Sequence, residues 1–401
     1  MTSEPTQIAP RTDGRTVTLP AVRELHYGSG ALELAAAQLS AMGEERVFVI
    51  ASRFSAAAVD RLAGALGDAY AGSFDEVVMH VRRDSVDAGL EAARRAGATA
   101  LISIGGGTEI DCTKAIALCL ACGFGSAHEL AAYRVRAGAG AGQAVAPVSI
   151  APPRHLAVPT TLSGAETTTL FGVTDPESSE KHVYSDPSLA PWTVVLDPGV
   201  AAGTPDWLWA SSGMRAVDHA VESVLSPRAW PLQDAVALEG LRVLRHNLIY
   251  SALNPDEVAA RRACQLGAWM ASYAVETSGV GLSHAIGHQL APQFDLAHGV
   301  TSAIMLPHVM GFNADVTAPA LERIASAGWG GGGAQAAVDG IRELAGSLRA
   351  AGIATTLSEA GADRPALDAV ADRVIADPSI DTNPKPVVRA DVMALFAAAW
   401  E

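Results

Sequence analysis

The chain has 401 residues, of which 49% are hydrophobic and 18% charged, and its formal net charge at pH 7 is -15. Single hydrophobic cores rarely grow beyond about 250 to 300 residues, so two domains are expected. An acidic chain has no positive field to hold phosphate backbones or anionic membrane surfaces. We therefore expect neither nucleic acid nor a membrane as a partner.

The start of the chain and its cysteines indicate a cytoplasmic protein. Residues 1–16 are polar and lack the apolar stretch of a signal peptide, so a disordered tail is expected there. No apolar run reaches the roughly 18 residues that span a bilayer. One C-x-x-C pair lacks the second pair or the histidines of a zinc site, so free thiols are expected at all four cysteines, Cys112, Cys119, Cys122 and Cys264.

Residues 17–198 alternate apolar, β-prone runs with Ala-rich amphipathic segments. RVFVIASRF, EVVMHV and ALISIGGG are separated by two helical patterns, which predicts a parallel sheet with crossover helices. HLAVPTT and WTVVLDP predict two further strands, at about 155–161 and 192–198. Between the strands, the stretch AGAGAGQAVAPVSIAPPR, at 137–154, is expected to form a flexible surface insertion, and the inserted segment as a whole covers about residues 123–152.

Residues 199–401 show long helical apolar spacing and few β-branched runs, so this half is expected to be an all-helical catalytic domain. A glycine cluster after Trp329 predicts a loop between two helices. The fold class predicted for the whole chain is an α/β dinucleotide-binding domain with a parallel sheet, followed by an all-α domain.

Two loops have the composition of a nucleotide site. Gly105–Gly107 follow a predicted strand and precede a predicted helix, where glycine permits close approach of phosphate and the free N–H groups attract it. Thr108 is a candidate N-cap and phosphate contact. Thr160 and Thr161 end the next strand and offer hydroxyls to ribose, phosphate or amide groups. Tight packing and a solvated turn are the plain alternatives.

GGGT followed by Asp111 and Lys114 resembles the GGGS-x-x-D-x-x-K element of the iron-containing alcohol dehydrogenase family, and PTTLSGAE resembles its second nucleotide loop. The resemblance extends from YGSGA near the start to DTNPKPV near the end. It implies the fold that this family shares with dehydroquinate synthase. It also implies cofactor contacts at Gly105, Gly106, Gly107, Thr108, Asp111, Thr160, Thr161 and, as a weaker match, Lys181.

The cofactor is expected to be NADPH or NADH. Ser52 and Arg53 stand where an acidic residue would bond the ribose hydroxyls of NADH, which favours NADPH, with Ser52 as a contact. A solvated loop charge is the alternative explanation of Arg53.

Candidate catalytic residues form two groups. Arg215, His219 and Glu222 have the spacing i, i+4, i+7 and lie on one face of a predicted helix. His284, His288 and His298 follow within fifteen residues of one another. A single histidine is more often structural than functional, but a cluster favours a site, with His288 as a proton relay.

A catalytic metal is not expected. The family pattern has an aspartate at the position of Arg215, followed by histidines at His219, His284 and His298, which would be the ligands if a metal were present. Arginine cannot ligate a metal, and its charge repels a dication. The maleylacetate reductase branch of the family, which lacks this aspartate and acts without metal on a dicarboxylate, resembles the chain at His80 in VVMHV and at NPKP.

The expected function is NAD(P)H-dependent reduction of an unsaturated or keto carboxylic acid. Arg215 and neighbouring imidazoles would hold the anionic substrate, and His288 or His284 would supply a proton. Arg215 and the insertion depart from the maleylacetate reductase pattern, which leaves the substrate open. A homodimer is expected from an edge strand near 17–25.

Three other functions remain open. The first is an iron- or zinc-dependent alcohol dehydrogenase or aldehyde reductase. The second is a lyase of the dehydroquinate synthase type, which the total of 28 Lys and Arg disfavours because that reaction needs a basic phosphate pocket. The third is a non-catalytic binding protein, which leaves the clustered imidazoles unexplained.

Overall fold

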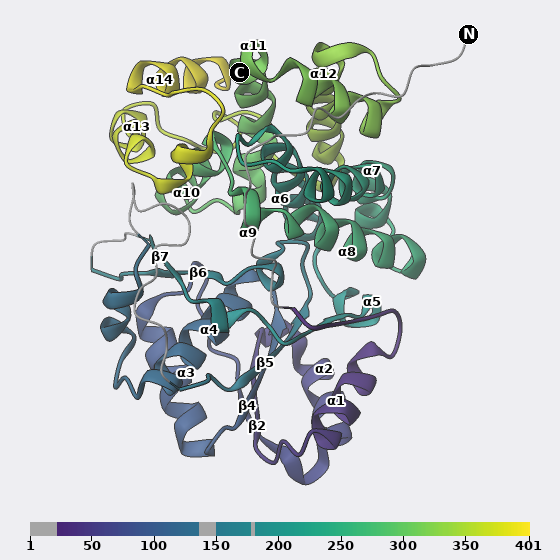
Figure 1. The fold of residues 1–401 in the computed structure, drawn as a ribbon, viewed down its shortest axis with the longest axis vertical. Helices are drawn as coiled ribbons and strands as arrows, with labels where there is room; N and C mark the ends of the chain where they lie inside the picture. The colour runs from purple at the N-terminus through teal and green to yellow at the C-terminus, as the bar shows by residue number, and fades with distance from the viewer. Residues whose placement is uncertain (1–21, 136–149, 178–180) are drawn as a thin grey trace.

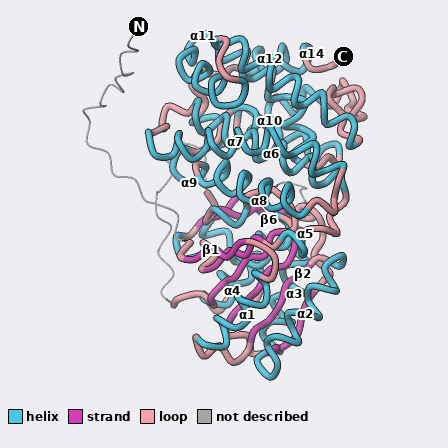
Figure 2. Tube along the Cα trace, turned by 90° about the vertical axis from the view of Figure 1, so that its right-hand side faces the viewer, coloured by secondary structure: helices cyan, strands magenta, loops and turns pink. Residues whose placement is uncertain are grey.

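The computed structural model describes residues 22–135, 150–177 and 181–401 (Figure 1). The strands lie in the N-terminal half of the molecule, and helices make up the C-terminal half (Figure 2). This arrangement confirms the predicted fold class. The expected tail, 1–16, and residues 136–149 of the expected insertion lie outside the described residues.

The main sheet has six strands in the order β1-β8-β5-β4-β2-β3, and every neighbouring pair is parallel. Its strands are β1 (Glu24–Tyr27), β2 (Val47–Ala51), β3 (Tyr70–Phe74), β4 (Ala100–Gly105), β5 (Arg154–Pro159) and β8 (Thr193–Leu196). Gly105 is paired with Pro159, so β4 and β5 end side by side. The glycine loop and the threonine loop therefore leave the sheet at adjacent points.

Four helices cover the two faces of this sheet. They are α1 (Ala31–Ala41), α2 (Ala56–Leu66), α3 (Arg83–Ala96) and α4 (Gly107–Cys122). In β2, Val47, Val49 and Ala51 pack with α1 and α2, whereas Phe48 and Ile50 pack with α3 and α4. This alternation follows from the two-residue period of a strand, and a strand buried on both faces is apolar throughout.

Two features of the N-terminal half were not expected. An antiparallel hairpin of β6 (Leu170–Thr174) and β7 (Lys181–Ser185) lies beside the main sheet. The inserted segment also contains a short helix before the stretch expected to be flexible, because Ala127–Tyr133 form the 3-10 helix η3. Leu130 and Tyr133 of η3 are buried in the same core as α4, which holds this segment against the domain.

Every secondary-structure element described after β8 is a helix, as expected. They are α5 (Pro198–Ala201), α6 (Asp206–Leu225), α7 (Pro231–Leu253), α8 (Val258–Tyr273), α9 (Val275–Ser278), α10 (Leu282–Phe294), α11 (His298–Trp329), α12 (Gly333–Ser347), α13 (Leu367–Ile375) and α14 (Arg389–Ala398), with short 3-10 turns between some of them. Gly330–Gly333 all have positive φ, and Gly330–Gly332 separate α11 from α12, as the glycine cluster predicted.

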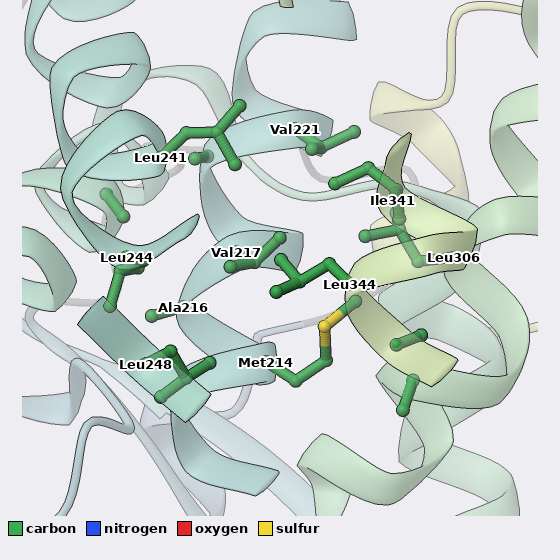
Figure 3. Packing of buried hydrophobic residues seen from close by; sticks show 14 of the residues in the cluster. Met214, Ala216, Val217, Val221, Leu241, Leu244, Leu248, Leu306, Ile341 and Leu344 are labelled. Atoms are coloured by element: carbon green, nitrogen blue, oxygen red, sulfur yellow. The ribbon is translucent and has the colours of Figure 1, made fainter. Parts of the chain in front are cut away.

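Helix α6 lies at the centre of the helical core. Its Met214, Val217 and Val221 point between α7 on one side and α11 and α12 on the other (Figure 3). No single helix among the described residues is long and apolar enough to cross a membrane. One pair, Gly107–Cys122 with Ala127–Tyr133, passes that test together, but it is bent by 86° and contributes to the core of the N-terminal half.

The packing of α7 on α8 leads to a stability prediction. A Cβ atom at Gly240 of α7 would lie 2.5 Å from the backbone nitrogen of Ala271 and 2.7 Å from the carbonyl oxygen of Gly267, both on α8. Gly240→Ala should therefore lower the free energy of unfolding by about 1–3 kcal/mol, because rigid backbone must move apart. A fall in Tm in differential scanning calorimetry would show it.

The matched control is Gly311, an exposed glycine inside α11 with open space where a Cβ would lie. Gly311→Ala should leave Tm unchanged or raise it, since alanine favours a helix interior by up to about 1 kcal/mol. Equal Tm values for the two variants would contradict close packing at Gly240.

Candidate functional site

A cavity of about 3050 Å³ lies between the two halves of the molecule. Its walls include the glycine loop, the threonine loop and the β6–β7 hairpin from the N-terminal half, and α6, α10 and the start of α11 from the helical half. The structure thus brings the predicted nucleotide loops and the predicted catalytic residues to one cavity.

The nucleotide loops face each other across the beginning of α4. The N–H of Thr160 donates to the carbonyl oxygen of Gly105 at 2.8 Å. Thr161 Oγ1 and Ser163 Oγ lie 3.2 Å from the positions that Cβ atoms would take at Gly106 and Gly107. Both hydroxyl oxygens are buried without a hydrogen-bond partner. They are free to bond a ligand that enters this cradle.

The start of α4 differs from the prediction at one position. Gly106 is the N-cap and Gly107 the first helical residue, so Thr108 is not the N-cap, although it lines the cavity. Glu109 caps the N-terminal end of α4, because its Oε2 accepts the N–H of Gly106 at 2.7 Å. Burial raises the pKa of Glu109 to about 7. Sequence reasoning missed Glu109, although it stands inside the GGGT-x-x-D element.

Asp111 and Lys114 attach the β6–β7 hairpin to α4. Asp111 Oδ2 accepts the N–H of Gly172 in β6 at 3.0 Å. The ammonium group of Lys114 donates to the carbonyl oxygens of Ala165 and Leu170, at 2.7 and 2.8 Å. The geometry gives both residues a structural role. A cofactor contact at Asp111 stays a prediction.

Lys181 of β7 lies at the cavity wall, where its side chain covers Gly172. Burial lowers its pKa, the charge of Asp111 opposes this, and the charge of Arg215 lowers it further. Lys181 also lowers the pKa of His298. The charge of Lys181 therefore acts on Arg215 and His298 of the histidine cluster as well as on Asp111 of the predicted cofactor site.

At the other end of the cavity, Ser52 caps the 3-10 helix η1 (Arg53–Ser55), and its side chain accepts the N–H of Phe54. Arg53 is exposed, with its guanidinium over the Phe54 ring at 5.0 Å from the centroid. Glu76 pairs with Ser52 in an antiparallel bridge and also lines the cavity. The sequence showed no acidic residue beside Ser52, but the segment after β3 brings Glu76 next to it. The sequence alone could not place this segment.

The guanidinium of Arg215 is at the centre of the histidine cluster. Its two terminal nitrogens lie 3.4 Å from Ser302 Oγ, 3.8 Å from Asp218 Oδ2 and 3.5 Å from His288 Nε2. Burial lowers the pKa of Arg215, whereas the charges of Asp218, Glu222 and Asp377 raise it. Arginine keeps its proton in proteins, so the site holds a fixed positive charge.

Asp218 is the counter-charge that the sequence analysis overlooked. Its carboxylate has no exposed surface, and it accepts hydrogen bonds from Ser283 Oγ at 2.8 Å and Ser302 Oγ at 2.6 Å. The signal was present in MRAVDHAVES, because Asp218 follows Arg215 by three residues and lies on the same helix face.

His284 is oriented by Glu222. His284 Nδ1 lies 2.7 Å from Glu222 Oε2, and Glu222 also accepts the N–H groups of Gly281 and Ser283 at 2.6 and 2.7 Å. Burial, followed by the charge of Asp218, raises the pKa of Glu222 to about 8. Nε2 of His284 has no partner.

His288 is held between two charged groups. Its Nδ1 lies 3.1 Å from Asp377 Oδ2, and Gln289 Nε2 donates to the same oxygen at 3.0 Å. Burial raises the pKa of Asp377, but His288 and the bonds from Ser379 outweigh it, and the net pKa is lowered. An ionised Asp377 favours a proton on Nδ1, which directs Nε2 toward Arg215 and the cavity.

The remaining imidazoles surround this pair. His219 Nδ1 bonds to Ser272 Oγ at 2.8 Å, and its ring stacks on His284 at 4.8 Å between centroids. His298 lies edge-on to His288, at 6.0 Å. Burial lowers the pKa values of His219, His284 and His298, and the charge of Arg215 acts in the same direction. All three are therefore neutral near pH 7.

His80 joins the cluster from the N-terminal half, with its ring 6.0 Å from that of His298. His80 and Val81 have φ values of 64° and 53°, a left-handed conformation that non-glycine residues rarely adopt. The segment is tied to β6, since Thr174 bonds to the carbonyl oxygens of both residues. Such local strain is typical of functional sites.

The donors of a metal site do not converge on the expected histidines. Among the described residues, the one group of three His, Cys, Asp or Glu ligand atoms that all lie within 4.8 Å is Asp218, Glu222 and His284, and it excludes His219 and His298. Its carboxylates already accept hydrogen bonds from serine hydroxyls, backbone N–H groups and His284. A cation there would have to displace this network.

Comparisons with known proteins agree with the fold and with the family resemblance. Residues 22–198 match the family model of iron-containing alcohol dehydrogenase, and residues 209–400 match that of the Fe-containing alcohol dehydrogenase family, C-terminal. A maleylacetate reductase of Burkholderia cepacia is 30% identical over 376 residues, which cover 94% of this chain and 95% of the relative.

Two further relatives show the range of the similarity. A lactaldehyde reductase of Escherichia coli is 30% identical over 332 residues, 82% of this chain and 84% of the relative. The crystal structure of a maleylacetate reductase from Rhizobium sp. has a TM-score of 0.78 at 26% identity, with 96% and 97% of the two chains covered. The chain is therefore an NAD(P)-dependent oxidoreductase that belongs to the iron-containing alcohol dehydrogenase family.

Proposed function

We propose that this protein uses NADPH or NADH to reduce an unsaturated or keto carboxylic acid, as a maleylacetate reductase does, and that it works without a catalytic metal. The observation that supports this most directly is the buried guanidinium of Arg215 at the centre of the cavity's histidine cluster. A guanidinium binds a carboxylate through two parallel hydrogen bonds and gains less from a neutral alcohol or aldehyde.

The same guanidinium argues against the metal that gives the family its name. It stands at the position of the expected aspartate ligand, and it cannot coordinate a cation. His219 and His284 stack on each other, and their nitrogens do not close on His298 within 4.8 Å. These observations support a site in which the ligands of the family pattern do not converge on iron or zinc, and the proposed chemistry uses no metal.

The nucleotide loops fit a dinucleotide. Gly106, Gly107 and Thr108 would hold its pyrophosphate at the start of α4, and the unpartnered hydroxyls of Thr161 and Ser163 would bond to it. A bound reduced nicotinamide supplies a hydride. Arg53 favours NADPH and Glu76 favours NADH, so both cofactors are candidates.

The residues of the cluster would divide the reaction between them. Arg215 would hold the substrate carboxylate and stabilise the negative charge that develops as the substrate accepts hydride. His288 is the better candidate for proton transfer of the two expected, because Asp377 orients its ring through Nδ1. His284 is buried beside Arg215, which disfavours its protonated form. His219 and His298 would complete the walls as neutral groups.

The assembly and the location of the protein stay predictions. A homodimer is proposed through β1, which lies at the edge of the main sheet and exposes Tyr27. A cytoplasmic location is proposed from the composition alone.

The proposed function predicts that Arg215→Met selectively lowers the turnover of acid substrates. Loss of a buried charged contact costs about 2–4 kcal/mol, so kcat/KM for the best enoic or keto acid should fall roughly 30- to 1,000-fold. Turnover of neutral aldehydes should change much less. NADPH and NADH oxidation would be measured with a panel that includes maleylacetate.

Arg215→Lys keeps the charge without the bidentate geometry. Its kcat/KM for the acid should therefore lie between those of the wild type and Arg215→Met. It also serves as a second variant if loss of charge beside Asp218 prevents folding. Arg373→Met is the matched control, because Arg373 lines the same cavity but bonds to Gln293 at 2.7 Å. Wild-type turnover of neutral aldehydes alone would refute the proposal.

The metal-free proposal predicts that chelator-treated wild type keeps its acid-dependent activity. Arg215→Asp restores the donor pattern of the family, so this variant should gain bound iron or zinc where the wild type gains little. Elemental analysis after incubation with each metal and desalting would measure this. Stoichiometric metal in the wild type, with activity lost on chelation and restored by metal, would contradict it.

The role of His288 predicts a loss in kcat for Asp377→Asn. Without the carboxylate, the His288 ring loses the acceptor that orients it, and kcat should fall by up to about 100-fold, since a positioned acid contributes roughly 10²–10⁴-fold. KM should change little. Gln289→Met, which removes another bond to the same carboxylate, is the control. A rise in KM with unchanged kcat would exclude a proton-transfer role.

A further inference from the structure

The cradle at the start of α4 already contains an anionic group of the chain itself. Glu109 Oε2 accepts the N–H of Gly106 at 2.7 Å, and Glu109 lines the cavity together with Gly106, Gly107 and Thr108. That N–H is one of the donors that a phosphate at this helix start would use. The side chain of Glu109 therefore occupies the place of a ligand.

The neighbouring backbone is shaped to accept this carboxyl group. A Cβ atom at Gly105 would lie 2.4 Å from Glu109 Oε2 and 2.5 Å from its Cγ and Cδ. The side chain of Glu109 thus folds back over Gly105 and is nine-tenths buried. Any side chain at position 105 would displace it, so the glycine serves Glu109 as well as a phosphate.

Two unpartnered hydroxyls show that the cradle is incomplete as it stands. Thr161 Oγ1 and Ser163 Oγ are buried, lie beside Gly106 and Gly107, and have no hydrogen-bond partner. Glu109 satisfies the N–H of Gly106 but neither hydroxyl. The site is therefore built for a larger group with several acceptor oxygens, such as a pyrophosphate, and Glu109 fills only part of it.

No other charged group neutralises Glu109 among the described residues. Burial raises the pKa of Glu109, and only backbone hydrogen bonds lower it, so no charged side chain is among the causes of its shift. Lys114 is engaged with the carbonyl oxygens of Ala165 and Leu170, and Arg53 lies over Phe54. Glu109 thus meets an arriving pyrophosphate without a cation between them.

We propose that the Glu109 carboxyl group competes with the cofactor pyrophosphate for the start of α4, so that cofactor binding is coupled to protonation of Glu109. The inference rests on the dinucleotide site of the proposed function, and it concerns binding and not the substrate. An ionised Glu109 would repel the pyrophosphate and retain the Gly106 N–H. A neutral Glu109 releases that N–H at lower cost, and the pyrophosphate then takes it over.

The direction of the pH dependence follows. Burial raises the pKa of Glu109 to about 7, so the carboxyl group is mostly neutral at pH 6 and ionised at pH 8. Affinity for the cofactor is then highest below about pH 7 and is lost as the pH rises above it. Uptake of one proton corresponds to a Kd that increases about tenfold per pH unit.

The test is the Kd of NADH, measured by fluorescence titration between about pH 6 and about pH 9. NADH is chosen because NADPH has a further phosphate, whose second pKa of about 6 would titrate as well. The wild-type Kd should rise about tenfold per unit above pH 7. Glu109→Gln, which keeps the hydrogen-bonding shape without the charge, should bind NADH with little dependence on pH.

Glu166→Gln is the matched control. Burial raises the pKa of Glu166 to about 7 as well, but Glu166 does not line the cavity, so this variant should follow the wild type. A flat wild-type profile, or a Glu109→Gln profile as steep as the wild type, would overturn the inference.

Calorimetry on the wild type keeps the inference testable if Glu109→Gln does not fold. Titration of NADH at pH 8 in buffers of different ionisation enthalpy should show uptake of about one proton per NADH. Binding without proton uptake would overturn the inference. If the wild type binds NADH with proton uptake but reduces no acid, the substrate proposal is refuted and this inference stands.

Discussion

The architecture of the catalytic side depends on one constraint, which is the burial of the Arg215 guanidinium. Removing a charge from water costs several kcal/mol unless it is paired and hydrogen-bonded. Asp218 supplies the countercharge on the same helix, and Ser283 and Ser302 hold Asp218 in place from α10 and α11. Three helices must therefore meet in one arrangement before Arg215 can be accommodated.

This arrangement sets the protonation of the surrounding imidazoles. His219, His284 and His298 are buried next to a permanent positive charge, which disfavours a second one. His288 is different because Asp377, from the segment after α13, approaches its far side. Chemically similar side chains thus acquire different surroundings through their neighbours.

The N-terminal half contributes a second arrangement that follows from strand geometry. Parallel strands end at the same edge of a sheet, so the loops after β2, β4 and β5 open into the same cavity. The hairpin of β6 and β7, attached through Asp111 and Lys114, adds Lys181 to the catalytic cluster. The glycine loop, the threonine loop, Glu109 and the histidine cluster thereby line one cavity.

The sequence by itself determined the fold class and drew attention to the glycine loop, the threonine loop, Arg215 and four histidines, all of which have residues at the cavity, because strand alternation, glycine turns and helical spacing are local properties. It did not reveal Asp218 as the counterion of Arg215, or the contacts of Glu76 and Asp377. The sequence also missed the ordered η3 and the hairpin that places Lys181. Only the tertiary structure decided these, since burial and hydrogen bonding between distant segments exist only once the chain is packed.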